Sequence, residues 1–361
     1  MRFLAKIALV LVLAAAAAAA RFWISMEWPY RDFPSEGVFV DLPHGASSRT
    51  VARLLQQNGV VRSATTFEIY ARRHPRRRLQ AGEYFFDHAI TGHDVFWQIA
   101  DGHVYEQPFT VREGETMYDI ARELEAGKFL AADKFLAAAQ NPEAVRDIAP
   151  QVKTLEGFLF PATYFLPRHP AATELTAEMV RKFREEWTRI VATSQIAPGS
   201  GLTEHIVTLA SLVERETPKP EERPLVAGAF ENRLHKNMRL QCDPTVIYAL
   251  EQSGQYQGSL TGEDLHFDSP YNTYQNTGLP PGPIGNPGEA SLRAAIAPAP
   301  TAYLYFVANT EGGHFFATTL EEHNRNVTKY RRLLAGMPAD RPPAPEVPNK
   351  PQGKHHKGAA R

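Results

Sequence analysis

Two neighbouring glutamates, Glu214 and Glu216, lie near the end of an apolar helical segment, "HIVTLASLVERETPKP", that starts at residue 205. With 3.6 residues per turn, Glu214 projects into the apolar side of this helix and Glu216 lies near the opposite edge of that side. Thr208 and Ser211 fall on the polar side. A carboxyl group among apolar side chains can serve as a proton donor, because burial favours its neutral form. The alternative is a glutamate that simply reaches water from the margin of an apolar stripe.

The position of Glu214 along the helix strengthens the expectation of a proton donor. Thr217 precedes a proline and is therefore disfavoured in helical dihedrals, so the helix is predicted to end there, with Glu214 in its last turn. The helix dipole is negative at that end and disfavours a further negative charge. We expect the pKa of Glu214 to rise from the usual value of about 4.3 toward neutrality.

The need for a second acid separates two kinds of sugar chemistry. Glycosidases usually pair the acid with another carboxylate, roughly 5 to 9 Å away, as nucleophile or base. The candidates are Glu216, Glu156 and Asp243, but Glu216 points the other way and Asp243 is expected to be a helix N-cap. No pair is evident. A lytic reaction needs one residue, since the C6 hydroxyl of the substrate replaces water and the same side chain acts as acid and then as base.

A second candidate region is the segment 268–288, "DSPYNTYQNTGLPPGPIGNPG". Its Pro, Gly and Asn content predicts a loop, whose backbone must be fixed by specific contacts. Tyr271 and Tyr274 could stack on sugar rings, and Asn272 could bond sugar hydroxyl or acetamido groups. A structural surface loop is the alternative. His314 and His323 are expected to pack or cap and not to bind ligands.

The elements that position these residues indicate an α+β protein. An amphipathic helix is expected over 173–191, and "VAGAFENRL" and "CDPTVIYALEQ" read as further helices, the latter with Asp243 at the N-cap and Pro244 first. The segment "YLYFVANTEGGHFFATT" predicts two strands around a turn. A capping box from Thr319 to Glu322 opens the last helix.

An internal repeat lies before these elements. Each copy reads as a short strand, a glycine turn, an amphipathic helix, a second helix and a closing strand, "AGEYFF" in the first copy and "PATYFL" in the second. Chance recurrence of such units is the alternative. The alignment matches the following pairs: Gly45 with Gly114, Ser47 with Thr116, Val51 with Ile120, Ala52 with Ala121, Arg53 with Arg122 and Leu55 with Leu124.

The second copy, "FTVREGETMYDIARELEAG", resembles the LysM module. That family binds glycans that contain N-acetylglucosamine. The resemblance covers about half a module and implies a LysM-like fold. A purely structural use of the module remains an alternative to sugar binding.

Composition excludes several classes of function. The chain has 361 residues, with 39 basic and 40 acidic side chains and a net charge of -1, so no general field attracts nucleic acid. Cys242 is its single cysteine, which excludes an intrachain disulfide and a Cys-rich zinc site, and no HExxH pattern occurs. Neither a metal nor another cofactor is indicated.

The N-terminus predicts a membrane segment. Arg2 and Lys6 precede an apolar run over 7–20, and Phe22 to Ile24 bring its length close to a bilayer span if Arg21 snorkels. The positive charges predict a cytoplasmic N-terminus and a body on the far side. A cleaved signal peptide is the alternative, and it would export the body as well.

Six motifs in order resemble the endolytic murein transglycosylases, the YceG-like family: "LEGFLFPATY", "ASLVERET", "FENRLHKNMRLQCDPTVIYAL", "SPYNTYQNTGLPPGPIGNPG", "YLYFVAN" and "GGHFFATTLEEHN". The match spans about 36–334. The resemblance implies a single-pass protein of the inner (cytoplasmic) membrane with its body in the periplasm. It also implies cleavage within nascent peptidoglycan strands, 1,6-anhydro-N-acetylmuramic acid ends, and action beside synthases of the penicillin-binding protein class.

The resemblance also implies roles for individual residues. The family's catalytic glutamate is the first in its "VERE" motif, which is Glu214 here. Cys242 stands where the family commonly has Ser or Thr, which puts a substrate hydrogen bond in doubt. The resemblance further suggests that six residues line the cleft: Glu156, Gln241, Asp243, Tyr271, Asn272 and Tyr274.

We therefore expect a membrane-anchored lytic transglycosylase that binds peptidoglycan, the membrane and peptidoglycan synthases of the penicillin-binding protein class, and no nucleic acid. A hydrolytic muramidase and a noncatalytic peptidoglycan-binding scaffold are the alternatives. The expected parts are a cytoplasmic N-terminus and transmembrane anchor (1–30), a first LysM-like module (36–106), a second LysM-like module (107–155), a catalytic α+β domain (156–336) and a flexible tail rich in Pro and Lys (338–361).

Overall fold

The computed structural model describes residues 2–194 and 201–337, in which helices and small antiparallel sheets confirm the predicted α+β class. The predicted tail, 338–361, lies outside the described residues. The chain divides into two compact units. The N-terminal unit comprises Met1–Val111, Ala121–Phe135 and Ala162–Leu175, and the C-terminal unit comprises Arg112–Ile120, Leu136–Pro161 and Thr176–Arg361.

Helices dominate the described residues, and the strands are short. The helices are α1 (Arg2–Glu27), α2 (Ser48–Gln57), α3 (Ala64–Arg73), α4 (Gly92–Ala100), α5 (Met117–Ala126), α6 (Ala132–Ala139), η1 (Pro142–Val145), α7 (Ala172–Ala192), α8 (Thr203–Glu216), α9 (Arg223–His235), α10 (Asp243–Gln252), η2 (Asp264–His266), α11 (Glu289–Ile296) and α12 (Leu320–Leu334). The strands are β1 (Val38–Leu42), β2 (Gly82–Phe86), β3 (Gln107–Thr110), β4 (Thr163–Leu166), β5 (Tyr305–Ala308) and β6 (His314–Ala317).

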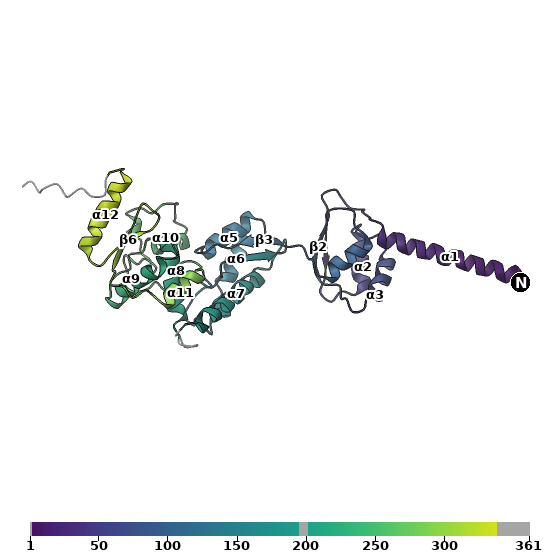
Figure 1. Ribbon diagram of the computed structural model, residues 1–361, viewed down its shortest axis with the longest axis horizontal. Coiled ribbons are helices and arrows are strands. Elements are labelled where there is room, and N and C mark those ends of the chain that lie inside the picture. Colours follow the sequence, from purple (N-terminus) through teal and green to yellow (C-terminus); the bar gives the residue numbers. More distant parts are fainter. Residues whose placement is uncertain (1, 195–200, 338–361) are drawn as a thin grey trace, which may run out of the picture. The chain divides into compact units, whose positions relative to one another are not determined.

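The N-terminal unit begins, after α1, with the order β1, α2, α3, β2, and the two strands pair antiparallel (Figure 1). Ser47 and Ser63 cap the two helices, because their hydroxyl oxygens accept hydrogen bonds from backbone N–H groups one turn on. Phe67 of α3 and Phe96 of α4 are fully buried in the core beneath the strands. This arrangement uses the apolar sides of three short helices to cover one small sheet.

The same order recurs in β3, α5, α6 and β4, and β3 pairs antiparallel with β4. The glycines of the predicted repeat, Gly45 and Gly114, both have a positive φ, 74° and 81°, as a tight turn requires. The matched apolar positions are buried in both copies: Val51 and Ile120, Ala52 and Ala121, Leu55 and Leu124. These observations agree with the repeat alignment. They do not test the resemblance to LysM, and β4 lies beyond residue 155, where the predicted second module ends.

In the C-terminal unit, α8 contacts α9, α10 and α11. All residues from Ile206 to Val213 are buried, so Thr208 and Ser211, on the predicted polar side of α8, are not exposed to water. Both Thr208 and Ser211 are buried, and the loop before α11 contacts Ser211. The Ser211 hydroxyl donates to the carbonyl oxygen of Thr208 and accepts a hydrogen bond from the N–H of Ile284. Strands β5 and β6 form the predicted hairpin, which contacts α12.

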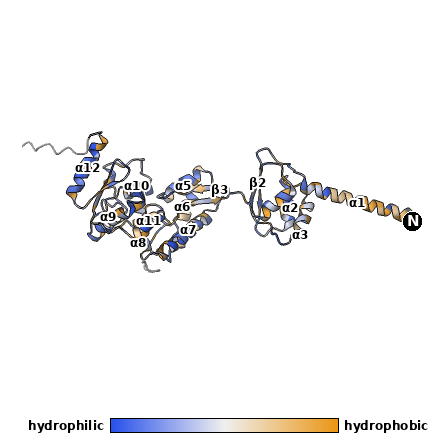
Figure 2. Cartoon of the chain, in the orientation of Figure 1, coloured by the Kyte–Doolittle hydropathy of each residue, from blue (hydrophilic) through white to orange (hydrophobic). Residues whose placement is uncertain are grey.

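Helix α1 is apolar over most of its length (Figure 2). Among the described residues, Phe3–Glu27 is long and apolar enough to cross a membrane, and its most apolar stretch is unburied. An N-terminal signal sequence has the same properties. The end of the helix belongs to the N-terminal unit, because Ser25 and Met26 are buried and α1 contacts α3 and α4.

The start of α10 differs from the prediction. Cys242 is the N-cap residue and Asp243 is the first residue of the helix, so the N-cap expected at Asp243 is wrong. The Cys242 side chain makes no capping hydrogen bond, and the Cys242 N–H donates to the hydroxyl of Thr273 at 3.0 Å. The carboxylate of Asp243 instead accepts a hydrogen bond from the hydroxyl of Tyr274.

Two phenylalanines of the N-terminal unit differ in burial and allow a matched test of its core. Phe67 is 0% exposed and Phe165 is 62% exposed. We expect Phe67→Ala to lower the free energy of unfolding by about 3–5 kcal/mol, because it leaves a cavity. Phe165→Ala should change it by less than about 1 kcal/mol. Chemical denaturation of the full chain measures both, and equal losses would contradict this description of the core.

Candidate active site

Glu214 is held inside the C-terminal unit by two donors. Its side chain is only 4% exposed, which is rare for a residue that can carry a charge. A guanidinium nitrogen of Arg223, at the start of α9, lies 2.7 Å from Oε1. The backbone N–H of Gly288, the N-cap residue of α11, donates to Oε2 at 2.9 Å. The carboxylate therefore joins the end of α8 to the starts of two other helices.

Burial raises the pKa of Glu214, as the helical phase predicts. The Gly288 N–H and the charge of Arg223 act in the opposite sense, because they favour the ionised form. The carboxylate of Glu113 raises the pKa further. The net shift is upward, so Glu214 holds its proton to a higher pH than an exposed glutamate does.

Arg223 connects two carboxylates. Its side chain is 7% exposed, and the same nitrogen that binds Glu214 lies 3.5 Å from Glu113, whose side chain is 49% exposed. Its Nε is buried and has no hydrogen-bond partner. Glu113 therefore brings a partly exposed second carboxylate close to Glu214, which the sequence analysis does not anticipate.

The loop before α11 is fixed by backbone pairing with the turn that contains Gly114. The Gly114 N–H donates to the carbonyl of Asn286 at 2.8 Å, and the Asn286 N–H donates to the carbonyl of Glu115 at 3.0 Å. A Cβ on Gly285 would lie 2.7 Å from the carbonyl oxygen of Gly114. Only glycine allows this close approach, which brings the N–H of Gly288 to Glu214.

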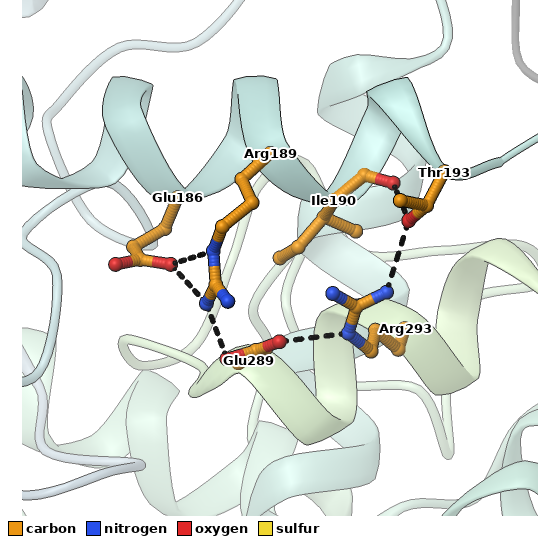
Figure 3. Close-up of polar contacts among 6 residues, drawn as sticks. All are labelled: Glu186, Arg189, Ile190, Thr193, Glu289 and Arg293. Atoms are coloured by element: carbon orange, nitrogen blue, oxygen red, sulfur yellow. Dashed lines mark hydrogen bonds and ion pairs between the residues drawn. The ribbon is translucent and has the colours of Figure 1, made fainter.

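A network of charged side chains fixes α11 on α7 (Figure 3). Arg189 of α7 binds Glu186 and also Glu289, which follows Gly288, at 2.6 Å. Arg293 binds the other oxygen of Glu289 at 2.8 Å and donates to the hydroxyl of Thr193 at 3.2 Å. Exposed ion pairs contribute little individually, but here they fix the helix end that faces Glu214.

Glu156 is placed in the interior, with 1% of its surface exposed. Both of its oxygens accept from the N–H of Met117, at 3.1 and 3.0 Å, so the Glu156 carboxylate caps the start of α5. The Asn286 amide donates to Oε1 at 3.0 Å. Burial raises the pKa of Glu156 to about 8, although the Met117 N–H and the Tyr248 hydroxyl favour its charged form. These contacts join Glu156 to the start of α5 and to the loop before α11.

Glu216 forms a separate cluster. Its carboxylate accepts a hydrogen bond from the thiol of the buried Cys242 at 3.4 Å. Burial raises the pKa of Glu216, while the Cys242 contact and the charge of His314 lower it. Only Glu214 is predicted to project into the apolar side of α8, but burial raises the pKa of both glutamates. The orientation of Glu216 toward Cys242 and away from Arg223 agrees with its predicted direction.

The predicted loop residues have different surroundings. Asn272 is fully buried, donates to the carbonyls of Leu265 and Phe267, and accepts from the N–H of Tyr274. It therefore holds the loop, as the structural alternative expects. Tyr274 is partly buried, and burial together with Asp243 raises the pKa of its hydroxyl.

Tyr271 and Gln241 retain exposed surface. The ring of Tyr271 lies 5.0 Å from that of Tyr248, and burial raises the pKa of Tyr271 to about 12. Gln241 is exposed and has a φ of 49°, a left-handed conformation, and its N–H donates to the carbonyl of Thr273. Asp243 is exposed as well. These residues remain available for a ligand.

Sequence patterns do not reveal four residues at the site: Arg223, Glu113, Gly288 and Asn286. Gly288 and Asn286 lie in the Pro- and Gly-rich segment 268–288, but no local pattern distinguishes them there. Arg223 and Glu113 come from segments far apart in the chain, so only the folded structure brings them together. In the part of the chain that the structure describes, no three His, Cys, Asp or Glu side chains are grouped as metal ligands would be.

Comparison with known proteins identifies the family. A model of the YceG-like family matches residues 40–329. The chain belongs to the YceG-like family. The resemblance found in the sequence motifs is thus confirmed, and Glu214 and the segment 268–288 fall inside the matched range.

Named relatives of this YceG-like protein come from two bacteria. It is 33% identical over 310 residues to the endolytic murein transglycosylase of Bacillus subtilis (strain 168), with 81% of this chain and 84% of the relative covered. It is 32% identical over 323 residues to the protein of the same name from Streptococcus pneumoniae serotype 2 (strain D39 / NCTC 7466), with 81% of this chain and 58% of that protein covered. The crystal structure of a yceG-like protein from Listeria monocytogenes matches with a TM-score of 0.50 at 33% identity, covering 81% of this chain and 99% of that one.

The close approach at Gly285 can be tested with a matched pair of substitutions. Gly285→Ala should destabilise the protein by about 1–3 kcal/mol and lower activity, because the new methyl group pushes the loop away from Gly114. Gly262→Ala is the control, since a Cβ at Gly262 meets no atom within 4 Å. Thermal unfolding and an activity assay measure both variants. Equal effects would contradict the proposed role of the contact.

The raised pKa of Glu156 predicts a dependence of stability on pH. The folded protein keeps this proton up to a pH of about 8, whereas the unfolded chain releases it near 4.5. The free energy of unfolding should therefore fall as pH rises through this window. Glu156→Gln should make that fall smaller, and Glu174→Gln, at an exposed glutamate, should not. Denaturation from pH 4.5 to 8 measures the slopes, and an unchanged slope in Glu156→Gln would show that Glu156 is ionised in the fold.

Proposed function

We propose that this YceG-like protein is a peptidoglycan lytic transglycosylase in which Glu214 is the catalytic acid and base. The observation that carries the proposal is the burial of Glu214 between Arg223 and the N–H of Gly288, with a raised pKa. Its relatives from Bacillus subtilis and Streptococcus pneumoniae, named endolytic murein transglycosylases, support the substrate class.

The reaction needs one residue that gives and then takes a proton. Glu214 protonates the oxygen that links N-acetylmuramic acid to N-acetylglucosamine, and the bond from C1 to that oxygen breaks. The muramoyl C6 hydroxyl then attacks C1 and gives its proton to the Glu214 carboxylate. The product is a 1,6-anhydro-N-acetylmuramic acid end, and Glu214 is protonated again. No water is consumed.

The contacts of Glu214 match both halves of this cycle. Burial and the Glu113 charge favour the protonated form that starts the reaction. Once the proton has left, Arg223 and the Gly288 N–H stabilise the carboxylate. Burial raises the pKa of Glu214, while Arg223 and the Gly288 N–H lower it, so each form of the side chain is stabilised by some of its surroundings. The same side chain can therefore serve both steps.

The other predicted residues divide into two roles. We assign sugar contacts to the residues that retain exposed surface, Gln241, Asp243, Tyr271 and Tyr274. We assign positioning roles to Glu156 and Asn272, whose polar groups bond protein atoms in the interior. Cleavage within nascent strands would then limit strand length.

We also propose that α1 anchors the protein in the cytoplasmic membrane, with its N-terminus in the cytoplasm and the two units outside. The length and exposure of Phe3–Glu27 support an anchor. Arg2 and Lys6 before the apolar run support the orientation. The anchored body would then work beside the synthases that extend the strands.

The chemistry is tested by replacing Glu214. Glu214→Gln should lower the rate of glycan cleavage by about 100-fold to 10,000-fold, because the amide cannot exchange a proton. Glu204→Gln, at the start of the same helix, is the matched control and should keep full activity. Mass spectrometry of purified glycan strands after incubation with each chain gives both the rate and the product. Equal activity of Glu214→Gln would remove Glu214 from the mechanism, and normal function of Glu214→Gln in cells would favour a noncatalytic scaffold.

The position of Glu113 favours a second candidate, hydrolysis by a muramidase, because a partly exposed carboxylate near the acid could activate water. The lytic proposal predicts anhydro ends in the wild type. It also predicts that Glu113→Gln keeps cleavage but lowers the pKa of Glu214, so the basic limb of the pH profile of kcat/KM moves to lower pH. Hydrolysis instead predicts reducing ends, heavier by one water, and a large loss of rate in Glu113→Gln.

A further inference from the structure

The N-terminal unit has a cavity of about 620 Å³ where α1 meets the rest of the unit. One wall is apolar and consists of Ala17, Ala20 and Ile24, which lie on α1. Ala17 and Ala20 belong to the apolar run predicted to lie in the membrane. If α1 spans the bilayer, this part of the cavity therefore lies at the depth where the lipid acyl chains meet the headgroups.

The rest of the cavity lining is polar and basic. Arg21, on α1, and Arg62, just before α3, both contribute to its lining. Both side chains are exposed, and no Asp or Glu among the described residues forms an ion pair with either. Ser63 also lines the cavity, and its Oγ accepts from the N–H and hydroxyl of Thr66, which leaves its own proton for a ligand.

Aromatic side chains lie beside two arginines of this unit, one of which lines the cavity. The guanidinium of Arg62 lies 4.5 Å from the ring centre of Tyr30. The guanidinium of Arg73, at the end of α3, lies 5.4 Å from the ring centre of Phe22. Trp23 and Trp28 are 59% and 57% exposed, as expected of residues in an interfacial belt. If α1 spans the bilayer, Arg21 and Arg62 therefore lie near the point where the chain leaves it.

We propose that this cavity binds an anionic phospholipid of the outer leaflet, with the phosphate between Arg21 and Arg62 and an acyl chain along Ala17 and Ala20. Guanidinium groups bind phosphate oxygens with two parallel hydrogen bonds, and an alanine wall leaves room for a chain. The bound lipid fixes the angle at which the N-terminal unit leaves the membrane. This inference does not depend on the glycan chemistry, but it requires that α1 stays attached.

Titration of the full chain in detergent with defined lipids, followed by native mass spectrometry, tests the proposal. The probes are phosphatidylglycerol, phosphatidylcholine and undecaprenyl diphosphate. The wild type should bind phosphatidylglycerol at least about tenfold more tightly than phosphatidylcholine. The double variant Arg21→Gln/Arg62→Gln should bind phosphatidylglycerol about 30-fold more weakly, since each arginine contributes about fivefold.

Two controls keep the result specific. Arg325→Gln/Arg331→Gln removes the same charge from exposed positions of α12 and should leave lipid binding unchanged. Arg21→Lys/Arg62→Lys keeps the charge and should retain most of the preference, which separates loss of binding from loss of folding.

Four outcomes would overturn the proposal. The first is equal binding of the two phospholipids by the wild type, and the second is an equal loss in the α12 control. The third is tighter, arginine-dependent binding of undecaprenyl diphosphate, which would assign the cavity to the lipid carrier of glycan strands. The fourth is an intact mass of the membrane-extracted chain that lacks α1.

Discussion

The ion pair between Glu214 and Arg223 is the interaction on which the rest of the site depends. Burial favours a protonated Glu214, while Arg223 and the Gly288 N–H favour a charged one, so the protonation of this side chain is set by a balance. A buried charge pair left without one of its members is costly, which constrains the start of α9 and the loop before α11. Three features hold Glu214 and the Gly288 N–H in place: the burial of α8, the backbone pairing at Gly114 and the ion pairs between α7 and α11 (Figure 3).

Much of this arrangement follows from local pattern. The helical phase predicts the burial of Glu214, and the proline after Thr217 predicts the end of α8, because both depend on residues close in sequence. The helices and the β5–β6 hairpin follow from periodicity and turn residues for the same reason. The motifs of the chain also predict its family, which the match over 40–329 confirms.

The remaining parts of the site depend on contacts between distant segments. Arg223 reaches Glu214 from another helix, and Asn286 joins Glu115, Glu156, Gly157 and Leu159 through one buried amide. Helix periodicity could not show that a loop would bond Ser211, or that Asp243 would bond Tyr274 instead of capping α10. Each of these contacts depends on which distant segments pack together. The spacing of residues within one segment does not predict such packing.

The most direct test of this account is the pKa of Glu214 itself. It can be measured in the full chain, labelled with carbon-13 at the glutamate carboxyl groups, by carbon NMR across a pH titration, with the Glu214→Gln spectrum identifying the signal. We predict a pKa above 4.5, the value of an unperturbed glutamate, and a further rise in Arg223→Gln, because the charged form then loses its counter-ion. A pKa at or below 4.5 in the wild type, or no change in Arg223→Gln, would contradict the claim that burial opposed by Arg223 sets the protonation of the catalytic acid.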